Sequence, residues 1–349
     1  MKKLIKSLKS LDLQPGMILA EDFIVNGVKL LTKDMEISYK AILKITNQFP
    51  EEYLEVYCDD NINYESLDAK KEKIEKNLTF LTNITEKIFF KIRENDKIEI
   101  NDVRNLSDML LNTKDDFGLI LKSIIVSRKV DEYTFRHSVN TAALAVMLGR
   151  WLDFSERSLR LLCYSGLLHD VGKSKIKPEI LNKKGPLTHK EYKEMKGHAK
   201  IGYDIVKKIP YIDNSVSLAV LMHHEREDGS GYPLKLNGGN IHTFGKIIAI
   251  VDTFDAMTSN RVYRNKISPL NVLKVIKEES FSKLDPVYCN IFITNLLDYY
   301  IGDNVVLSNG KIGRIIKMNI NDITCPLVKV DSTFFDLSKN KDITIQDML

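Results

Sequence analysis

The sequence predicts a mainly α-helical protein, with a mixed α/β module before the helices and a small β-rich tail after them. Apolar residues recur every three or four positions through most of residues 67–298, which is typical of amphipathic helices. An Asn-Gly pair separates two short apolar runs near the N-terminus, and β-type runs return after residue 300. We expect an N-terminal module over residues 1–65, a helical connector over 66–99, a helical domain over 100–298 and a β-rich extension over 299–349.

Composition narrows the class of protein. The 349 residues suffice for about two domains, and 44% hydrophobic with 28% charged residues is ordinary for a globular chain. A net charge of only +4 argues against a partner that is a DNA or RNA polymer. The four cysteines are scattered without a CxxC pair, which indicates a reducing compartment. The sequence shows no signal peptide and no membrane span, so we expect a cytoplasmic protein.

The N-terminal module alternates short strands and turns. Asn26-Gly27 lies between the apolar runs 17–24 and 28–31, and this dipeptide is a strong hairpin signal. Residues 39–48 follow with a helical pattern and residues 53–58 with a strand pattern. None of these elements carries residues that suggest chemistry.

The connector shows apolar residues on one helical face: Ile74, Leu78, Leu81, Ile84, Ile88 and Ile92. A long amphipathic helix of this kind either forms a homodimer contact or packs on its own domain. Both interpretations stay open.

The central domain reads as helical almost throughout, and the tail as a small hairpin or meander. Thr188 and Glu191 form a capping box that predicts one helix start. Residues 246–256 (KIIAIVDTFDA) are apolar on nearly every side, so we expect a buried central helix there. The expected helices are 119–130, 134–151, 156–169, 188–208, 214–225, 245–258 and 269–280, and the expected tail strands are 304–307, 314–318 and 327–330.

Two polar doublets follow apolar helices. His169-Asp170 comes after LLCYSGLL, and His223-His224 closes SLAVLMHH. Both side chains of a doublet can face one site where a helix ends, and Gly172 is expected to supply that end for the first doublet.

Further polar residues lie on apolar faces. Asp252 and Asp255 are inside the most apolar helix, where a carboxylate is costly unless it is paired or binds a cation. His137 begins another helix with an inward apolar face, and His198 precedes Gly202 by one turn. Any one of these is more often a core residue or a cap, but together they predict a site for two metal ions. Imidazole and carboxylate ligands without thiolate suit Fe, Mn, Ni or Zn.

Flexible and basic residues flank this constellation. The segment EREDGSGYP contains Gly229 and Gly231, which allow positive φ and close approach of a ligand. Arg261 and Arg264 follow the Asp-containing helix, and paired guanidinium groups suit a phosphodiester or a guanine edge. Lys173 adds a point charge beside the first doublet.

Five blocks together resemble the HD-GYP family, a branch of the HD metal-dependent phosphohydrolases. The blocks are DEYTFRHS (131–138), HDVGK (169–173), HAKIG (198–202), HHEREDGSGYP (223–233) and VDTFDAMTSNRVYR (251–264). A bare HD doublet is weak, whereas five blocks in this order are specific. The resemblance covers roughly residues 100–298, and DNVVLSNGKIGRI looks like a tail present on some members.

The resemblance implies an all-helical HD-type catalytic domain that hydrolyses cyclic di-GMP to pGpG and could carry it on to GMP. A hydroxide activated by two divalent metals, Fe or Mn above Ni, Zn or Mg, would attack phosphorus. Positions carried over from the family place one metal on His137, His169, Asp170 and Asp252, and the second on Asp170, His198, His223 and His224.

The same resemblance implies roles around the metals. Asp170 would bridge the two ions, and Lys173 would stabilise a non-bridging phosphate oxygen. Arg261 and Arg264 would bind phosphate or guanine. The lip of the pocket would be shaped by Gly231, Tyr232 and Pro233.

One departure from the family pattern affects the metal count. Some members carry a Glu four residues before the first His, which completes a third metal site; here Tyr133 stands there and Glu132 is one residue off register. We therefore expect two metals and hydrolysis limited to the first step. Two alternatives stay open: an HD phosphohydrolase acting on another cyclic dinucleotide or nucleotide, and a non-catalytic receptor for cyclic di-GMP.

Overall fold

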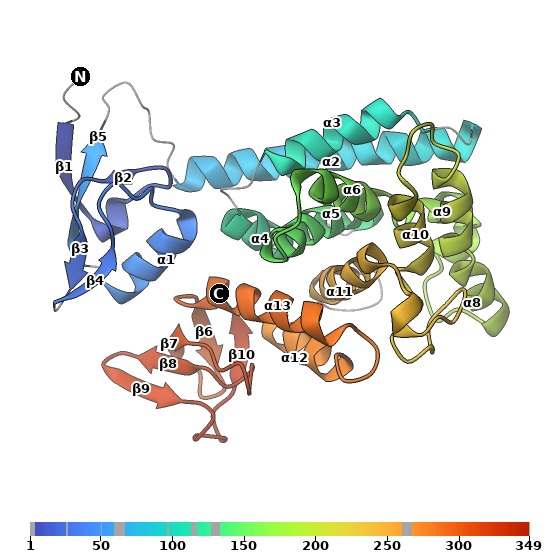
Figure 1. The fold of residues 1–349 in the computed structure, drawn as a ribbon. Helices are drawn as coiled ribbons and strands as arrows, with labels where there is room; N and C mark the ends of the chain where they lie inside the picture. The colour runs from blue at the N-terminus through green and yellow to red at the C-terminus, as the bar shows by residue number, and fades with distance from the viewer. Residues whose placement is uncertain are drawn as a thin grey trace. The chain divides into compact units, whose positions relative to one another are not determined.

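The structure, a computed structural model, confirms the mainly α-helical class with small sheets near both ends (Figure 1). It describes residues 4–25, 27–49, 51–58, 67–95, 98–112, 117–126, 133–259 and 267–348. Over these residues, no helix is long and apolar enough to cross a bilayer. The chain divides into two compact units, Met1–Ile74 with Leu296–Leu349, and Glu75–Asn295. The domain limits at residues 65, 99 and 298 stay predictions.

The N-terminal part contains two small sheets and one helix. An antiparallel sheet has the order β1-β5-β2, with β1 (Leu4–Lys9), β5 (Tyr53–Cys58) and β2 (Ile18–Leu19). The hairpin expected around Asn26-Gly27 is present as β3 (Phe23–Val25) and β4 (Val28–Leu31), and Gly27 has φ +77. The expected helix is α1 (Tyr39–Gln48), which begins where the Ser38 hydroxyl accepts the Ala41 N–H.

The second unit is built of helices. Its elements, with those that cross its limits, are α2 (Leu67–Asn95), α3 (Ile100–Leu111), α4 (Phe117–Val126), α5 (Tyr133–Trp151), α6 (Glu156–Leu168), the 3₁₀ turn η3 (Val171–Lys175), α7 (Pro178–Leu181), α8 (His189–Lys196), α9 (His198–Val206), α10 (Asn214–Met222), α11 (Thr243–Thr258), α12 (Pro269–Glu279) and α13 (Pro286–Leu297).

Helix α11 lies at the centre of this unit, as its apolar sequence predicts. It packs against α5, α10 and α12, while α5 also packs along α6. Ile247, Ile250 and Phe254 of α11 are fully buried. Because these helices meet around one core, the polar residues on their inner faces are brought together.

The helix expected over residues 188–208 is two helices in the structure. The capping box is present: Thr188 accepts the Glu191 N–H and Glu191 accepts the Thr188 N–H. Helix α8 ends because the Gly197 N–H turns to the Glu194 carbonyl, which tightens the last turn. A new helix, α9, then begins at His198, so this histidine lies at a helix start.

The C-terminal residues form an antiparallel sheet of order β10-β6-β7-β8-β9. The expected strands correspond to β6 (Asn304–Leu307), β7 (Ile312–Lys317) and β8 (Leu327–Val330), so the meander is confirmed. Two further strands, β9 (Thr333–Asp336) and β10 (Ile345–Met348), complete the sheet and were not expected.

Candidate metal centre

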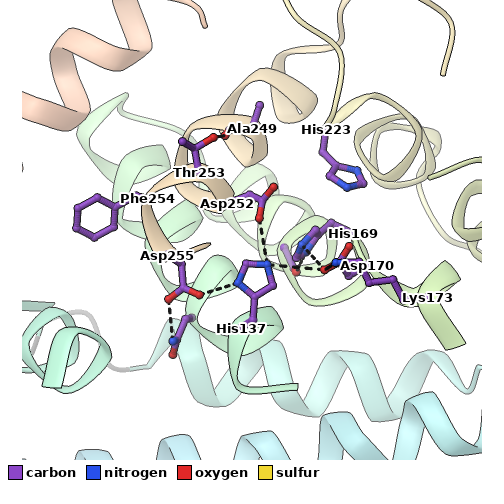
Figure 2. Close-up of polar contacts among 12 residues, drawn as sticks. His137, His169, Asp170, Lys173, His223, Ala249, Asp252, Thr253, Phe254 and Asp255 are labelled. Atoms are coloured by element: carbon purple, nitrogen blue, oxygen red, sulfur yellow. Dashed lines mark hydrogen bonds and ion pairs between the residues drawn. The ribbon is translucent and has the colours of Figure 1, made fainter. Parts of the chain in front are cut away.

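Histidines and carboxylates from five helical elements converge inside the second unit (Figure 2). They form two groups, and within each group the ligand atoms all lie within 4.8 Å of one another. The first group is His137, His169 and Asp252; the second is Asp170, His198, His223 and His224. The sequence interpretation divided these residues in the same way, with Asp170 shared between the groups.

Helix ends place several of these side chains. His169 is the residue that ends α6, Asp170 immediately precedes η3, and His223 ends α10. Gly172 has a different role from the expected helix end: a Cβ atom there would overlap the backbone carbonyl of His198. Only a glycine therefore lets α9 approach η3 this closely.

Three of the histidines are oriented by the same local contact. The Nδ1 atoms of His169, His198 and His223 lie 2.8, 2.8 and 2.7 Å from the carbonyl oxygen three residues earlier. Because a carbonyl oxygen can only accept, each Nδ1 carries the proton. Each Nε2 atom therefore directs a lone pair into the cluster, which is how metal-binding histidines are usually fixed.

The donor set leaves lone pairs that only a cation or a proton can satisfy. The Nε2 atoms of His198 and His223 face each other at 3.3 Å. His169 Nε2 and Asp170 Oδ1 are buried and have no hydrogen-bond partner among the described residues. Buried polar atoms are rarely left in this state. The residues present therefore fit divalent metal ions.

Burial keeps three rings neutral. Burial lowers the pKa of His198 to about 4, and it also holds the pKa values of His223 and His224 well below the ordinary value. A neutral imidazole is the form that binds a metal.

Asp170 lies between the two groups. Its Oδ2 is 3.3 Å from His169 Nε2, and its Oδ1 is 3.4 Å from His198 Nε2. Lys173 Nζ donates to Oδ2 at 2.5 Å. Burial alone would raise the pKa of Asp170, but the charge of Lys173 and the neighbouring histidines hold it well below the ordinary value. The carboxylate is thus ionised and placed to contact both groups.

His137 faces carboxylates on both sides. Its Nε2 is 3.0 Å from Asp252 Oδ1, and its Nδ1 is 2.6 Å from Asp255 Oδ2 (Figure 2). Burial would lower the pKa of this ring, but the hydrogen bonds to Asp252 and Asp255 outweigh burial and raise it to about 9. Burial would likewise raise the pKa of Asp252, yet its bond to His137 keeps that pKa well below the ordinary value.

The glycine-rich loop closes against this cluster. The Tyr232 ring stacks on the His224 ring, with 4.6 Å between centroids and 28° between planes. The peptide bond from Tyr232 to Pro233 is cis. Gly229 has the expected positive φ of +74. Gly231 does not have a positive φ. A glycine is needed at this position for lack of space, since a Cβ atom there would lie 2.5 Å from the Glu225 Cα.

Two residues that support the site, Glu225 and Asn140, were not identified from sequence, and Asp255 was singled out there without a defined role. The carboxylate of Glu225, which is 2% exposed, accepts the N–H groups of residues 234, 235 and 236 and so fixes the loop. Asn140 donates to Asp255, which in turn contacts His137. The sequence held a signal for two of these residues, because the acidic Glu225 directly follows the histidine pair and Asp255 lies in an apolar helix.

The two arginines expected to bind substrate, Arg261 and Arg264, lie outside the described residues, as does Glu132, the glutamate that is one residue off the family register. Tyr133 is the first residue of α5. Lys173 and Tyr232, by contrast, are both placed at the cluster.

Comparison with known proteins identifies the helical domain. Residues 120–287 match the HD domain family. The match covers just under half of the chain and lies within its helical part. A solved HDG"Y"P protein from Bdellovibrio bacteriovorus has the same fold, with a TM-score of 0.54 and 14% identity over 84% of this chain and 99% of that chain. The resemblance indicated by the five motifs is thereby confirmed.

Curated relatives that resemble this chain are bacterial phosphodiesterases. The chain is 32% identical over 210 residues to a cyclic di-GMP phosphodiesterase of Pseudomonas aeruginosa, and the aligned region covers 60% of this chain and 50% of the relative. The chain is 34% identical over 182 residues to a 3'3'-cGAMP-specific phosphodiesterase of Vibrio cholerae, and the aligned region covers 52% of this chain and 42% of the relative. The chain thus spans half or less of the length of these two relatives.

Proposed function

We propose that this protein is a metal-dependent phosphodiesterase that hydrolyses cyclic di-GMP to pGpG. The observation that carries the proposal is the pair of adjacent ligand groups, one of which contains Asp170, with the Nε2 lone pairs of three histidines directed inward. The name of the Pseudomonas aeruginosa relative supports the choice of substrate.

The first group with Asp170 would hold one divalent ion, and the second group, which contains Asp170, would hold the other. Fe or Mn is the metal we propose, while Ni, Zn and Mg have compatible ligands. When bound, such ions supply a water of lowered pKa and positive charge for the phosphate. Metal analysis of anaerobically prepared protein should give two ions per chain, and three would contradict this assignment.

The remaining roles belong to the chain's own residues. Lys173 is charge-paired with Asp170 and would stay beside the ligand groups to contact a non-bridging phosphate oxygen. Gly231, Tyr232 and Pro233 would form the lip, with the Tyr232 ring as a wall over His224. Arg261 and Arg264 would bind phosphate or guanine.

A second substrate, 3'3'-cGAMP, is favoured by the name of the Vibrio cholerae relative. Guanine presents O6 and N7 acceptors to an arginine, whereas adenine places an amino donor beside N7. Parallel turnover of cyclic di-GMP and 3'3'-cGAMP by metal-loaded protein separates the two proposals through the ratio of kcat/KM values. We expect that ratio to favour cyclic di-GMP. Binding without hydrolysis of either would instead favour the receptor hypothesis.

The connector helix α2 is proposed as a homodimer contact. Phe80 and Phe90 of this helix are 52% and 51% exposed. Light scattering during gel filtration measures the oligomeric state directly, and a monomer at all concentrations would contradict this proposal.

A further inference from the structure

A chain of hydrogen bonds connects helix α2 to the ring of His137. Glu75 of α2 accepts from both terminal nitrogens of Arg136, at 3.2 and 3.0 Å. The Arg136 Nε atom donates to Asn140 Oδ1 at 3.2 Å, and Asn140 Nδ2 donates to Asp255 Oδ1 at 2.9 Å. Asp255 Oδ2 then lies 2.6 Å from His137 Nδ1, as Figure 2 shows.

The direction of these bonds is fixed from one end to the other. A guanidinium group can only donate, so Asn140 must turn its oxygen to Arg136 and its amino group to Asp255. Asp255 Oδ1 already accepts from Asn140, and its Oδ2 lies 2.6 Å from His137 Nδ1, so a proton on Nδ1 completes the series of donors and acceptors. The opposite ring nitrogen, Nε2, therefore faces Asp252 and Asp170, at 3.0 and 3.7 Å.

Burial makes this direction hard to reverse. His137 and Asn140 are 2% exposed and Asp255 is fully buried, and the side chain of Arg136 is only 11% exposed. Turning the Asn140 amide over would place two donors face to face at Arg136, away from water. A buried donor without an acceptor is costly, so one arrangement dominates.

We propose that Glu75, Arg136, Asn140 and Asp255 are positioning residues that hold His137 as the Nδ1-protonated tautomer. Through it they set the metal affinity of the group His137, His169 and Asp252. The inference rests on the proposed function, because it takes that group as a metal site. Its outer end is on α2, the helix that follows the N-terminal module in the chain.

Calorimetric titration of the chelator-treated full chain with Mn²⁺ tests the proposal. Asn140→Leu removes the donor to Asp255, and we expect one of the two metal sites to weaken about 10- to 100-fold while the other keeps its affinity. Glu75→Gln acts from an exposed position and should weaken the same site about 3-fold. Asp102→Asn is the matched control. Asp102 of α3 forms an exposed ion pair with Lys91 of α2 at 3.1 Å, and the loss of this pair should change the affinity of neither metal site.

A spectroscopic readout separates positioning from a general structural effect. In Zn²⁺-loaded wild-type protein, ¹⁵N NMR of the imidazoles should show His137 protonated at Nδ1, and Asn140→Leu should reduce that signal. Circular dichroism checks that the variants fold. If Asn140→Leu does not fold, the Mn²⁺ affinities of Glu75→Gln and of its control Asp102→Asn are compared instead, and that comparison tests the proposal. If wild type binds two ions but the variants match its affinities, the positioning role is overturned and the phosphodiesterase proposal stands. If wild type binds no divalent metal, both fail.

Discussion

The metal-free helical unit should lose stability when the pH falls from 7 to 5. The pKa of His198 is about 4 in the folded protein against an ordinary 6.5, because the ring is buried. The unfolded chain therefore binds this proton first as the pH falls, and stability is lost from about pH 6.5 downward. Burial also lowers the pKa values of His223 and His224, so all three rings act in the same direction.

The size of the effect follows from linkage. For His198, the shift from 6.5 to about 4 corresponds to a loss of about 2 kcal/mol between pH 7 and pH 5. Burial lowers the pKa values of His223 and His224 as well, so both rings add to this loss. His137 acts the other way, because its pKa is raised to about 9: its contribution is complete below pH 6.5 and is lost as the pH rises to 9. It offsets about 1 kcal/mol of the loss that the three buried rings cause.

Urea unfolding of chelator-treated protein measures this loss. Trp151, the only tryptophan in the sequence, ends α5, so its fluorescence reports on the helical unit. His223→Gln should reduce the loss between pH 7 and pH 5, because it removes a ring whose pKa burial lowers in the folded protein. His189→Gln, which changes an exposed residue at the start of α8, should leave it unchanged. A free energy of unfolding that is equal at pH 5 and pH 7 would refute the reasoning.

Three substitutions test other parts of the site. Gly172→Ala places a methyl group on the His198 carbonyl, so the urea midpoint should fall by the equivalent of about 3 kcal/mol, and an unchanged midpoint would contradict the close approach of α9. Glu225→Gln turns one acceptor into a donor, at a cost of about 1–3 kcal/mol, and hydrogen exchange at the amides of residues 234–236 should speed up accordingly. Lys173→Met should lower turnover about 100-fold with metal content unchanged; loss of bound metal would instead assign the lysine to metal binding.

Local patterns predicted much of the fold because local interactions decide those elements. The helix at residues 39–48 and the strand at 53–58 agree with α1 and β5, where capping and alternation are readable in the sequence. The break between α8 and α9 was not predicted. It depends on Gly197 bonding to Glu194 while a tertiary contact holds His198, and periodicity does not record such contacts.

The candidate ligands stood out in the sequence because polar residues on or at the ends of apolar helices are unusual, while their division into two groups followed from the resemblance to the HD-GYP family. Their supporting residue Asn140 did not stand out. Asn140 resembles any other polar residue of α5 until Asp255, which lies far along the chain, is placed 2.9 Å away. The role of Gly172 likewise depends on where the His198 carbonyl lies in space.

Chromatography of cyclic di-GMP after incubation with the Mn²⁺- or Fe²⁺-loaded protein tests the proposed phosphodiesterase most directly. We expect wild type to convert it to pGpG. Asp170→Ala removes the carboxylate of the second ligand group that also lies beside His169 of the first, and should leave cyclic di-GMP intact. Cyclic di-GMP that stays intact with metal-loaded wild type, or equal conversion by Asp170→Ala, would contradict the account.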